Sequence, residues 1–388
     1  MAAGRVDDSR PDHESPEDGL TPGSGNEPFR VHAPRPRSGF SQRAPTMKDI
    51  AAASGVSQST VSRVLSGTRT AVPINEVTRQ RVLDVARQMR YHPNPLARGL
   101  RGSRTMLLGV IVREITDPFF ATAVDAVSFE ARKLGYNVVL GHTHGRTEEA
   151  RAVRAVLETR HCDAIVVLGD TSDQPRFIDD LRQANVEVVG MWQGSGNVRG
   201  VQTVSVDNAA GINMLIDHLL ELGHRRIGFI SGGFSSGRLI GDIAERRSAF
   251  VERLARERLF IQSSWLREAA NTMAGGAGAF DALMREPDRP TAVICSTDLM
   301  AIGALHAAYG AGIAVPDEVS IVGFDDLPLA SFTNPALTTI HNPTGEMAEV
   351  GVRGAIEPTD QGRRGGVRVL APSLVARGSS GPPTISRP

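Results

Sequence analysis

Polar side chains are concentrated in one short stretch near the start of the chain, TMKDIAAASGVSQSTVSRVLSG (46–67). At helical spacing its second half places Gln58, Ser59, Ser62 and Arg63 on one face. The segment from Thr46 to Arg104 has ten basic and three acidic side chains, although the formal net charge of the whole chain is zero. Amide, hydroxyl and guanidinium groups can read base edges and bind phosphates, so this segment suits a nucleic acid. The alternative is a solvated basic surface.

Two short helices joined by a turn are predicted to position these side chains. Thr46 and Asp49 have the spacing of an N-cap and its reciprocal acid, Gly55 suits the positive φ of a tight turn, and Ser57 can cap the second helix. A third helix follows Asn75. The apolar positions of the three helices are Ile50, Ala53, Val61, Val64, Leu65, Val82, Val85, Ala86 and Met89. The pattern predicts a helix-turn-helix, with an ordinary three-helix bundle as the alternative.

The next segment, PNPLARGLR (93–101), predicts a helix of only about two turns, which is marginal on its own in water. Asn94 can cap it and Pro95 suits its first position. Gly99 lowers its helix propensity by about 1 kcal/mol relative to alanine. Such a segment should fold only when something holds it, and the alternative is a plain linker. Residues 1–45, rich in Pro, Gly, Ser and mixed charge, are predicted to be disordered.

After Thr105, short apolar runs alternate with helical patterns, for example MLLGVIV, CDAIVVLG, RRIGFISG and VSIVGFDD. This rhythm predicts parallel sheets with helices on both faces. About 280 residues are too many for one such sheet, so two α/β lobes are expected. In this architecture ligands bind at the carboxyl ends of strands, which places the expected site in the cleft between the lobes.

Signatures of an enzyme are missing from this part of the sequence. The phosphate-binding loop, the nucleophile elbow and the zinc-binding HExxH pattern are absent, and GGAGAF lies within a helical pattern. Cys162 and Cys295, the only cysteines, lack metal-ligand spacing. We therefore expect a binding protein that uses no cofactor or metal. It lacks an apolar run of 18 residues and an N-terminal signal core, so a cytoplasmic location is expected.

Residues 46–377 resemble the lactose-repressor (LacI) family of transcriptional regulators. The matching motifs are TMKDIAAASGVSQSTVSRVLSG, YHPNPLARGLR, ITDPFF, VSVDN, LGHRRIGFISG, STDLMAIGAL, VPDEVSIVGFDDLPLA and PALTTIHNP. The loop TRTAVPI looks longer than usual for the family. The resemblance implies a small all-α helix-turn-helix headpiece followed by a two-lobed α/β core of periplasmic-binding-protein type. It also implies a repressor that binds a pseudo-palindromic operator in double-stranded DNA as a homodimer.

The same resemblance assigns residues to two sites. In the hinge helix, Leu100 would be the apolar wedge in the minor groove, with Ala97 beside it. The DNA-binding residues are Thr46, Ser57, Gln58, Ser59, Thr60, Ser62, Arg63, Ala97 and Leu100. The effector-binding residues are Phe120, Trp192, Arg246, Asn271 and Asp298. An arginine fork and a carboxylate suit a sugar, polyol or nucleoside. Alternatively, Phe120 is a core residue and Arg246 and Asp298 form a structural ion pair.

Two positions depart from the pattern common in the family. Many members have aspartate at Met191 and an aromatic residue at Asn271, which argues against a simple hexose as the ligand. The expected domains are a disordered extension (1–45), the headpiece (46–92), the hinge (93–104), the effector-binding and dimerisation core (105–378) and a flexible tail (379–388). The rival functions are a free solute-binding receptor, which needs export, and a sugar-modifying enzyme, which needs a nucleophile or paired carboxylates.

Overall fold

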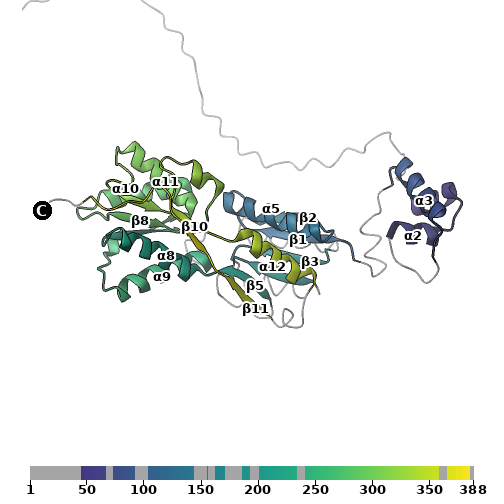
Figure 1. Ribbon diagram of the computed structural model, residues 1–388, viewed down its shortest axis with the longest axis horizontal. Helices are drawn as coiled ribbons and strands as arrows, with labels where there is room; N and C mark the ends of the chain where they lie inside the picture. Colours follow the sequence, from purple (N-terminus) through teal and green to yellow (C-terminus); the bar gives the residue numbers. More distant parts are fainter. Residues whose placement is uncertain are drawn as a thin grey trace, which may run out of the picture. The chain divides into compact units, whose positions relative to one another are not determined.

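The computed structural model of the chain (Figure 1) describes residues 45–66, 73–91, 104–143, 155, 162–170, 186–192, 201–233, 241–357 and 365–384. The chain divides into two compact units, Met1–His92 and Pro93–Pro388, and each is described by itself. The predicted extension up to residue 44 and the predicted hinge positions Ala97 and Leu100 lie outside the described residues. Within the described residues, no helix has the length and apolar character needed to cross a membrane.

The first unit contains the three predicted helices, α1 (Met47–Ser54), α2 (Gln58–Ser66) and α3 (Glu76–Gln88). The predicted capping box is present, since the Thr46 N–H donates to Asp49 Oδ2 (2.7 Å) and the Asp49 N–H donates to Thr46 Oγ1 (3.4 Å). Gly55 ends α1 with φ +66°, as its place in the turn requires.

Most of the apolar stripe predicted for these helices forms their core. The buried members of the predicted stripe are Ile50, Val61, Val64, Val82 and Ala86, and Ala51, which was not predicted, is buried with them. The prediction for Ala53 is wrong, because this side chain is exposed and the buried positions of α1 are Ile50, Ala51 and Ser54. Ser54 is tolerated inside because its Oγ donates to the carbonyl of Ile50 (2.6 Å).

The second unit has the two predicted α/β lobes. Six parallel strands form the first sheet, in the order β11-β5-β4-β3-β1-β2. They are β1 (Leu107–Val112), β2 (Asn137–His142), β3 (Ala164–Leu168), β4 (Glu187–Met191), β5 (Gln202–Val206) and β11 (Gly366–Leu370). Helices α5 (Pro118–Lys133) and α12 (Thr344–Ile356) contact each other and this sheet (Figure 1).

Four parallel strands form the sheet of the second lobe, in the order β7-β6-β8-β9. They are β6 (Ile227–Gly233), β7 (Leu266–Ala270), β8 (Ala292–Cys295) and β9 (Ser320–Val322). The helices of this lobe are α8 (Asn208–Glu221), α9 (Gly241–Arg256), α10 (Met273–Met284) and α11 (Asp298–Gly310). Figure 1 shows α8 and α9 on one face of the sheet and α10 and α11 on the other. Strands β6, β8 and β9 are therefore buried on both faces, as their continuous apolar runs predict, whereas the edge strand β7 is partly exposed.

The chain passes between the lobes more than once. It leaves the first lobe between β5 and α8, and returns from β10 (Thr339–His341) to α12. It then runs from β11 to β12 (Ser373–Val375), which pairs antiparallel with β10. Short 3-10 helices lie at Ser263–Trp265 and Pro328–Phe332. The described residues therefore join the two lobes by three crossings of the chain.

The start of the predicted flexible tail belongs to the packed core. Ser379 is fully buried, and its main chain bonds to Ala336 and Ile321 while its Oγ accepts from the Thr338 N–H (2.8 Å). The prediction of a flexible segment from residue 379 is therefore wrong for 379–384, and residues 385–388 lie outside the described part.

A buried histidine holds the end of this C-terminal segment. His224 Nδ1 lies 2.9 Å from Thr291 Oγ1, and its Nε2 lies 3.0 Å from Ser320 Oγ and 2.9 Å from the carbonyl oxygen of Gly381. Burial lowers the pKa of His224 below its ordinary value of 6.5. Since a carbonyl can only accept, the neutral ring donates from Nε2 to Gly381.

We expect His224 to make folding stability depend on pH. A lowered pKa means that the His224 ring binds a proton more readily in the unfolded chain than in the folded protein. The stability that the neutral ring contributes is therefore complete above pH 6.5 and is lost as pH falls through the lower pKa of the folded state. Denaturant unfolding of wild type and His224→Gln at pH 7.5, 6.5 and 5.5 measures the effect. The variant should lose part of the acid dependence, whereas His306→Gln, at an exposed position, should keep it. Identical slopes in wild type and His224→Gln would contradict this role.

Candidate functional site

The polar face predicted on α2 is exposed at its first turn. Gln58 and Ser59 are exposed, and Thr60, Ser62 and Arg63 are partly buried. Ser57 Oγ accepts from the Thr60 N–H (3.2 Å) and lies 2.8 Å from Ser59 Oγ, so the start of the helix is capped. Backbone N–H groups at a helix start and short polar side chains there are suited to DNA contact.

A cavity lies between the two lobes of the core, and the space of about 430 Å³ between its walls includes open solvent. It is lined by Asp117, Phe119, Phe120, Gly169, Asp170, Trp192, Asp242, Ile243, Arg246, Asn271, Thr297 and Asp325. Most of these residues follow the carboxyl ends of the strands β1, β3, β4, β7, β8 and β9. The cavity is therefore where a two-lobed parallel α/β architecture is expected to bind a ligand.

Aromatic rings form one side of the cavity. Phe119 meets both Phe120 and Trp192 edge to face, with ring centroids 5.3 Å apart in each pair. Trp192 has φ +55°, a backbone conformation that turns the chain immediately after β4. The predicted effector residues Phe120 and Trp192 thus both lie in the cavity wall, where ring faces and edges can contact an apolar ligand surface.

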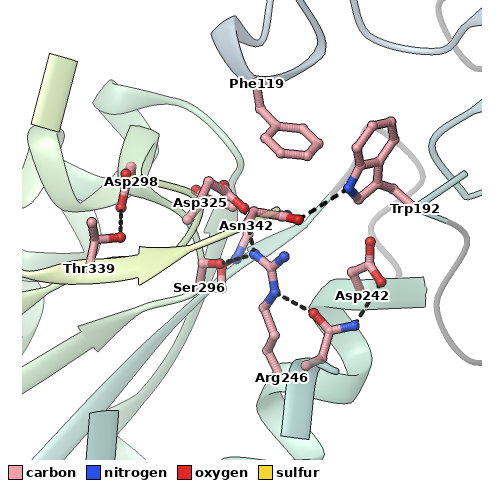
Figure 2. Close-up of polar contacts among 12 residues, drawn as sticks. Phe119, Trp192, Asp242, Arg246, Ser296, Asp298, Asp325, Thr339 and Asn342 are labelled. Carbon is pink, nitrogen blue, oxygen red and sulfur yellow. Dashed lines mark hydrogen bonds and ion pairs between the residues drawn. The ribbon is translucent and has the colours of Figure 1, made fainter. Parts of the chain in front are cut away.

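Arg246, also predicted from the sequence, is the central cation of the cavity wall and is 3% exposed. Its Nε donates to Asn208 Oδ1 (2.9 Å) and its Nη1 donates to the carbonyl of Ser296 (2.7 Å). The same Nη1 lies 3.3 Å from Asp325 Oδ1, and the guanidinium carbon lies 3.6 Å from the ring centroid of Phe324. Figure 2 shows Arg246 beside Ser296 and Asp325. These contacts hold the guanidinium in one position, as a preorganised donor requires.

Asp298 does not line the cavity, so its predicted role is not supported by the structure. It is fully buried, and it accepts hydrogen bonds from the Leu327 N–H (2.8 Å) and Thr339 Oγ1 (2.5 Å). Figure 2 shows its carboxylate directed to Thr339. The alternative of an Arg246–Asp298 ion pair is also not observed, because the carboxylate paired with Arg246 belongs to Asp325.

Asn271 lies in the cavity wall as predicted and connects the two lobes. Its Nδ2 donates to Asp117 Oδ2 (3.0 Å) across the cleft, and its Oδ1 accepts from Thr297 Oγ1 (2.8 Å). Met191, the other departure from the family pattern, is fully buried in β4 and lies outside the lining. At Asn271, therefore, an amide bridge between lobes stands where many family members have an aromatic ring.

The cavity wall is rich in carboxylates. Asp117, Asp170, Asp242 and Asp325 line it, and Arg246 is the one cationic side chain among the described lining residues. Burial raises the pKa of Asp117 and Asp242 above the ordinary value of 3.8, and that of Asp325 well above it, although the Arg246 guanidinium opposes the shift. These buried acceptors favour a ligand that supplies hydroxyl or N–H donors.

Sequence reasoning missed these four aspartates. Asp325 and Asp326 directly follow the apolar run VSIVGF. Two adjacent acids at the carboxyl end of a buried strand are a sequence signal for a ligand site there. Both have positive φ, +122° and +53°, which a sequence pattern does not indicate. Strained backbone of this kind gathers at functional sites, since it directs side chains to positions that regular structure cannot reach.

Comparison with known proteins agrees with both units. Residues 46–94 match the family model for bacterial regulatory proteins of the lacI family, and residues 216–380 match the periplasmic binding protein-like domain. The chain is 33% identical to the HTH-type transcriptional regulator GalS of Salmonella typhimurium, over 86% of this chain and 96% of that protein. It is 30% identical to the HTH-type transcriptional repressor CytR of Escherichia coli K12, over 87% and 97%.

A solved structure of the Lac repressor dimer bound to operator and the anti-inducer ONPF has the same fold. Its TM-score is 0.77 and its sequence identity is 24%, with 87% of this chain and all of that chain covered. The match extends over headpiece and core alike, and the identity to GalS and CytR spans nearly the whole of those proteins. The chain belongs to the lacI family of bacterial regulatory proteins.

Proposed function

We propose that the chain is a ligand-responsive repressor that binds a pseudo-palindromic DNA operator as a homodimer. One observation carries the proposal: a helix-turn-helix with Gln58 and Ser59 exposed occurs in one chain with a preorganised cavity around Arg246 and Asp325. Neither the headpiece nor the core alone distinguishes a transcriptional regulator from a solute receptor, but their presence in one chain does. The Lac repressor dimer bound to operator supports the homodimer, since a two-fold dimer matches two half-sites.

The effector is a small molecule with several hydroxyl groups, of the sugar, polyol or nucleoside class. Asp325 and Asp117 are buried acceptors, Asp242 is a half-buried acceptor, Arg246 is a fixed donor, and the rings of Phe119, Phe120 and Trp192 contact apolar faces. Ligand binding changes the angle between the lobes and thereby changes operator affinity, a coupling that is reciprocal between the two sites. The protein acts on DNA in the cytoplasm and catalyses no reaction.

Operator binding is tested with DNA fragments that flank the gene for this chain. Gel-shift titrations of the full chain, with and without pools of sugars and nucleosides, should reveal a fragment bound tightly and a pool that changes that affinity. Binding that is equal for flanking and random DNA, at several salt concentrations, would contradict sequence-specific regulation.

We expect the first turn of α2 to set base preference. Replacing Gln58 and Ser59 together should change the preferred operator bases, at about 1–3 kcal/mol for each lost bidentate contact. Selection from a randomised DNA library measures the change. Lys48→Ala, at an exposed position of α1, is the control and should weaken all sequences alike. An unchanged preference in the double variant would place the base-reading surface elsewhere.

A further inference from the structure

A hydrogen bond between two side chains joins the lobes of the core across the cavity. Asn271 Nδ2 donates to Asp117 Oδ2 (3.0 Å). Asp117 follows β1 in the first lobe and caps α5, since its Oδ1 accepts from the Phe119 N–H (3.0 Å). Asn271 follows β7 in the second lobe. The Asp117 carboxylate therefore caps a helix of its own lobe and also accepts a bond from the other lobe.

The second lobe holds the Asn271 amide in the orientation that this bond needs. Asn271 Oδ1 accepts from Thr297 Oγ1 (2.8 Å), and the main-chain N–H of Asn271 donates to the carbonyl of Gly233 (3.1 Å). The side chain also packs against Gly232, where an added Cβ would lie 2.9 Å from Asn271 Oδ1. Because Oδ1 is bonded within its own lobe, Nδ2 is directed at the first lobe. An aromatic side chain, common in the family at this position, lacks the amide that makes both bonds.

The bond lies at a distance from two of the three crossings of the chain. β7 is an edge strand of the second sheet, and the segment that leads into β10 pairs with β9 at the other edge. From β10 the chain returns to the first lobe, and β12, which follows the third crossing, pairs with β10. A rotation of the lobes about these two crossings therefore separates Asn271 from Asp117.

The cavity is narrow while the two lobes are in contact. Only about 50 Å³ between its walls can hold the centres of water-sized groups. This is room for a few water molecules, so a larger ligand requires the walls to move apart. The lobes also approach each other at the start of α9, where a Cβ added to Gly241 would lie 2.5 Å from Asp170 Oδ2 of the first lobe. Separation of the lobes thus widens the cavity and breaks the bond from Asn271 to Asp117.

We propose that Asn271 and Asp117 form a latch that holds the two lobes together without help from a ligand. Both partners belong to the chain, so the bond needs no third component. A hydrogen bond to a carboxylate favours the arrangement that contains it by a factor of about ten or more. A ligand that widens the cavity has to break the latch. This inference concerns the core and does not rest on DNA binding.

The test measures how often the cavity opens in the full chain. Ile243 on α9 is buried and lines the cavity, so the thiol introduced by Ile243→Cys reports its opening. The rate at which a maleimide labels such a buried thiol is proportional to the fraction of open molecules. Without added ligand, Asn271→Ala should raise this rate by about tenfold or more, because the latch is lost.

A second variant removes the latch from the other lobe. Asp117→Ser keeps a side chain that caps α5 but is too short to reach Asn271. It should raise the labelling rate as much as Asn271→Ala does, and the two substitutions together should raise it no further, because both remove the same bond. Gln262→Ala is the matched control, since Gln262 Nε2 donates to Asp288 Oδ2 (3.0 Å) within the second lobe. It should leave the rate within about twofold.

The two native cysteines distinguish separation of the lobes from loosening of the fold. Cys162 is buried in the core of the first lobe and Cys295 in that of the second. Their labelling rates in Asn271→Ala should stay within about twofold of those in the parent chain. An unchanged rate at Ile243→Cys, or equal acceleration of the native cysteines, overturns the latch. Neither result touches the proposed function, which fails instead if no flanking DNA fragment is bound specifically.

Discussion

Replacing Arg246 with methionine should lower the free energy of unfolding of the core by about 3–5 kcal/mol, because it leaves a buried carboxylate without its cation. Arg246 and Asp325 are both less than 10% exposed and lie 3.3 Å apart. The substitution also leaves Asn208 Oδ1 and the Ser296 carbonyl without this donor. Methionine retains much of the side-chain volume, so the loss reports charge and hydrogen bonding more than packing.

The pH dependence of this loss identifies its origin. Burial already raises the pKa of Asp325 well above 3.8, so the folded protein binds this proton more readily than the unfolded chain does. Stability from such a group is present at low pH and is lost as pH rises through the folded pKa. Without Arg246 the pKa of Asp325 should rise further. The difference in free energy of unfolding between Arg246→Met and wild type should therefore shrink as pH is lowered. Denaturant unfolding followed by tryptophan fluorescence at pH 7.5 and 5.5 measures it.

Two further variants provide the controls for Arg246. Arg253→Met lies on the same helix, but its partners Asp217 and Glu257 are 50% and 40% exposed, so its loss should be about 1 kcal/mol or less. The double variant Arg246→Met/Asp325→Asn should recover part of the stability, because the buried charge is removed together with its partner. A loss at Arg246 no larger than that at Arg253 would contradict a buried ion pair that stabilises the site.

The headpiece could be predicted in detail because its determinants are local. The partners of the Thr46–Asp49 capping box are only three positions apart, and the turn needs only the positive φ that Gly55 supplies. The βα alternation of the core was equally readable, since buried parallel strands appear as continuous apolar runs. Ala53 shows the limit of such patterns: helical spacing alone does not fix which edge of the apolar stripe meets the other helices.

The cavity was only partly predictable because the direction of a side chain at a strand end depends on the backbone there. Asp298 and Asp325 both follow apolar runs of the second lobe, yet Asp298 is the first residue of α11 and its carboxylate accepts from Leu327 and Thr339. Asp325 is directed to Arg246 from a position with φ +122°. The bond from Asn271 to Asp117 joins residues 154 positions apart, a distance over which no local pattern operates.

The two aspartates permit a direct test of which one binds the effector. Asp325→Asn should weaken effector affinity by about 1–3 kcal/mol, because an acceptor for a ligand donor is replaced by an amide. Asp298→Asn should leave effector affinity unchanged. Its Oδ1 can still accept from the Leu327 N–H, and its Nδ2 can donate to Thr339 Oγ1, since a hydroxyl both donates and accepts. Calorimetry with the effector, on both variants and wild type, measures the difference.

Asp298→Asn should increase the stability of the fold. An unchanged effector affinity in this variant would then not result from misfolding. Burial raises the pKa of Asp298 from 3.8 to about 6, so wild-type stability from this group is present at low pH and is lost as pH rises through 6. Asparagine has no charge to bury, so Asp298→Asn should gain stability relative to wild type between pH 5 and pH 8. The opposite result, in which Asp298→Asn loses effector affinity and Asp325→Asn keeps it, would support the sequence-based assignment of Asp298. The ligand would then have to reach a carboxylate that is bonded to Leu327 and Thr339 in this structure.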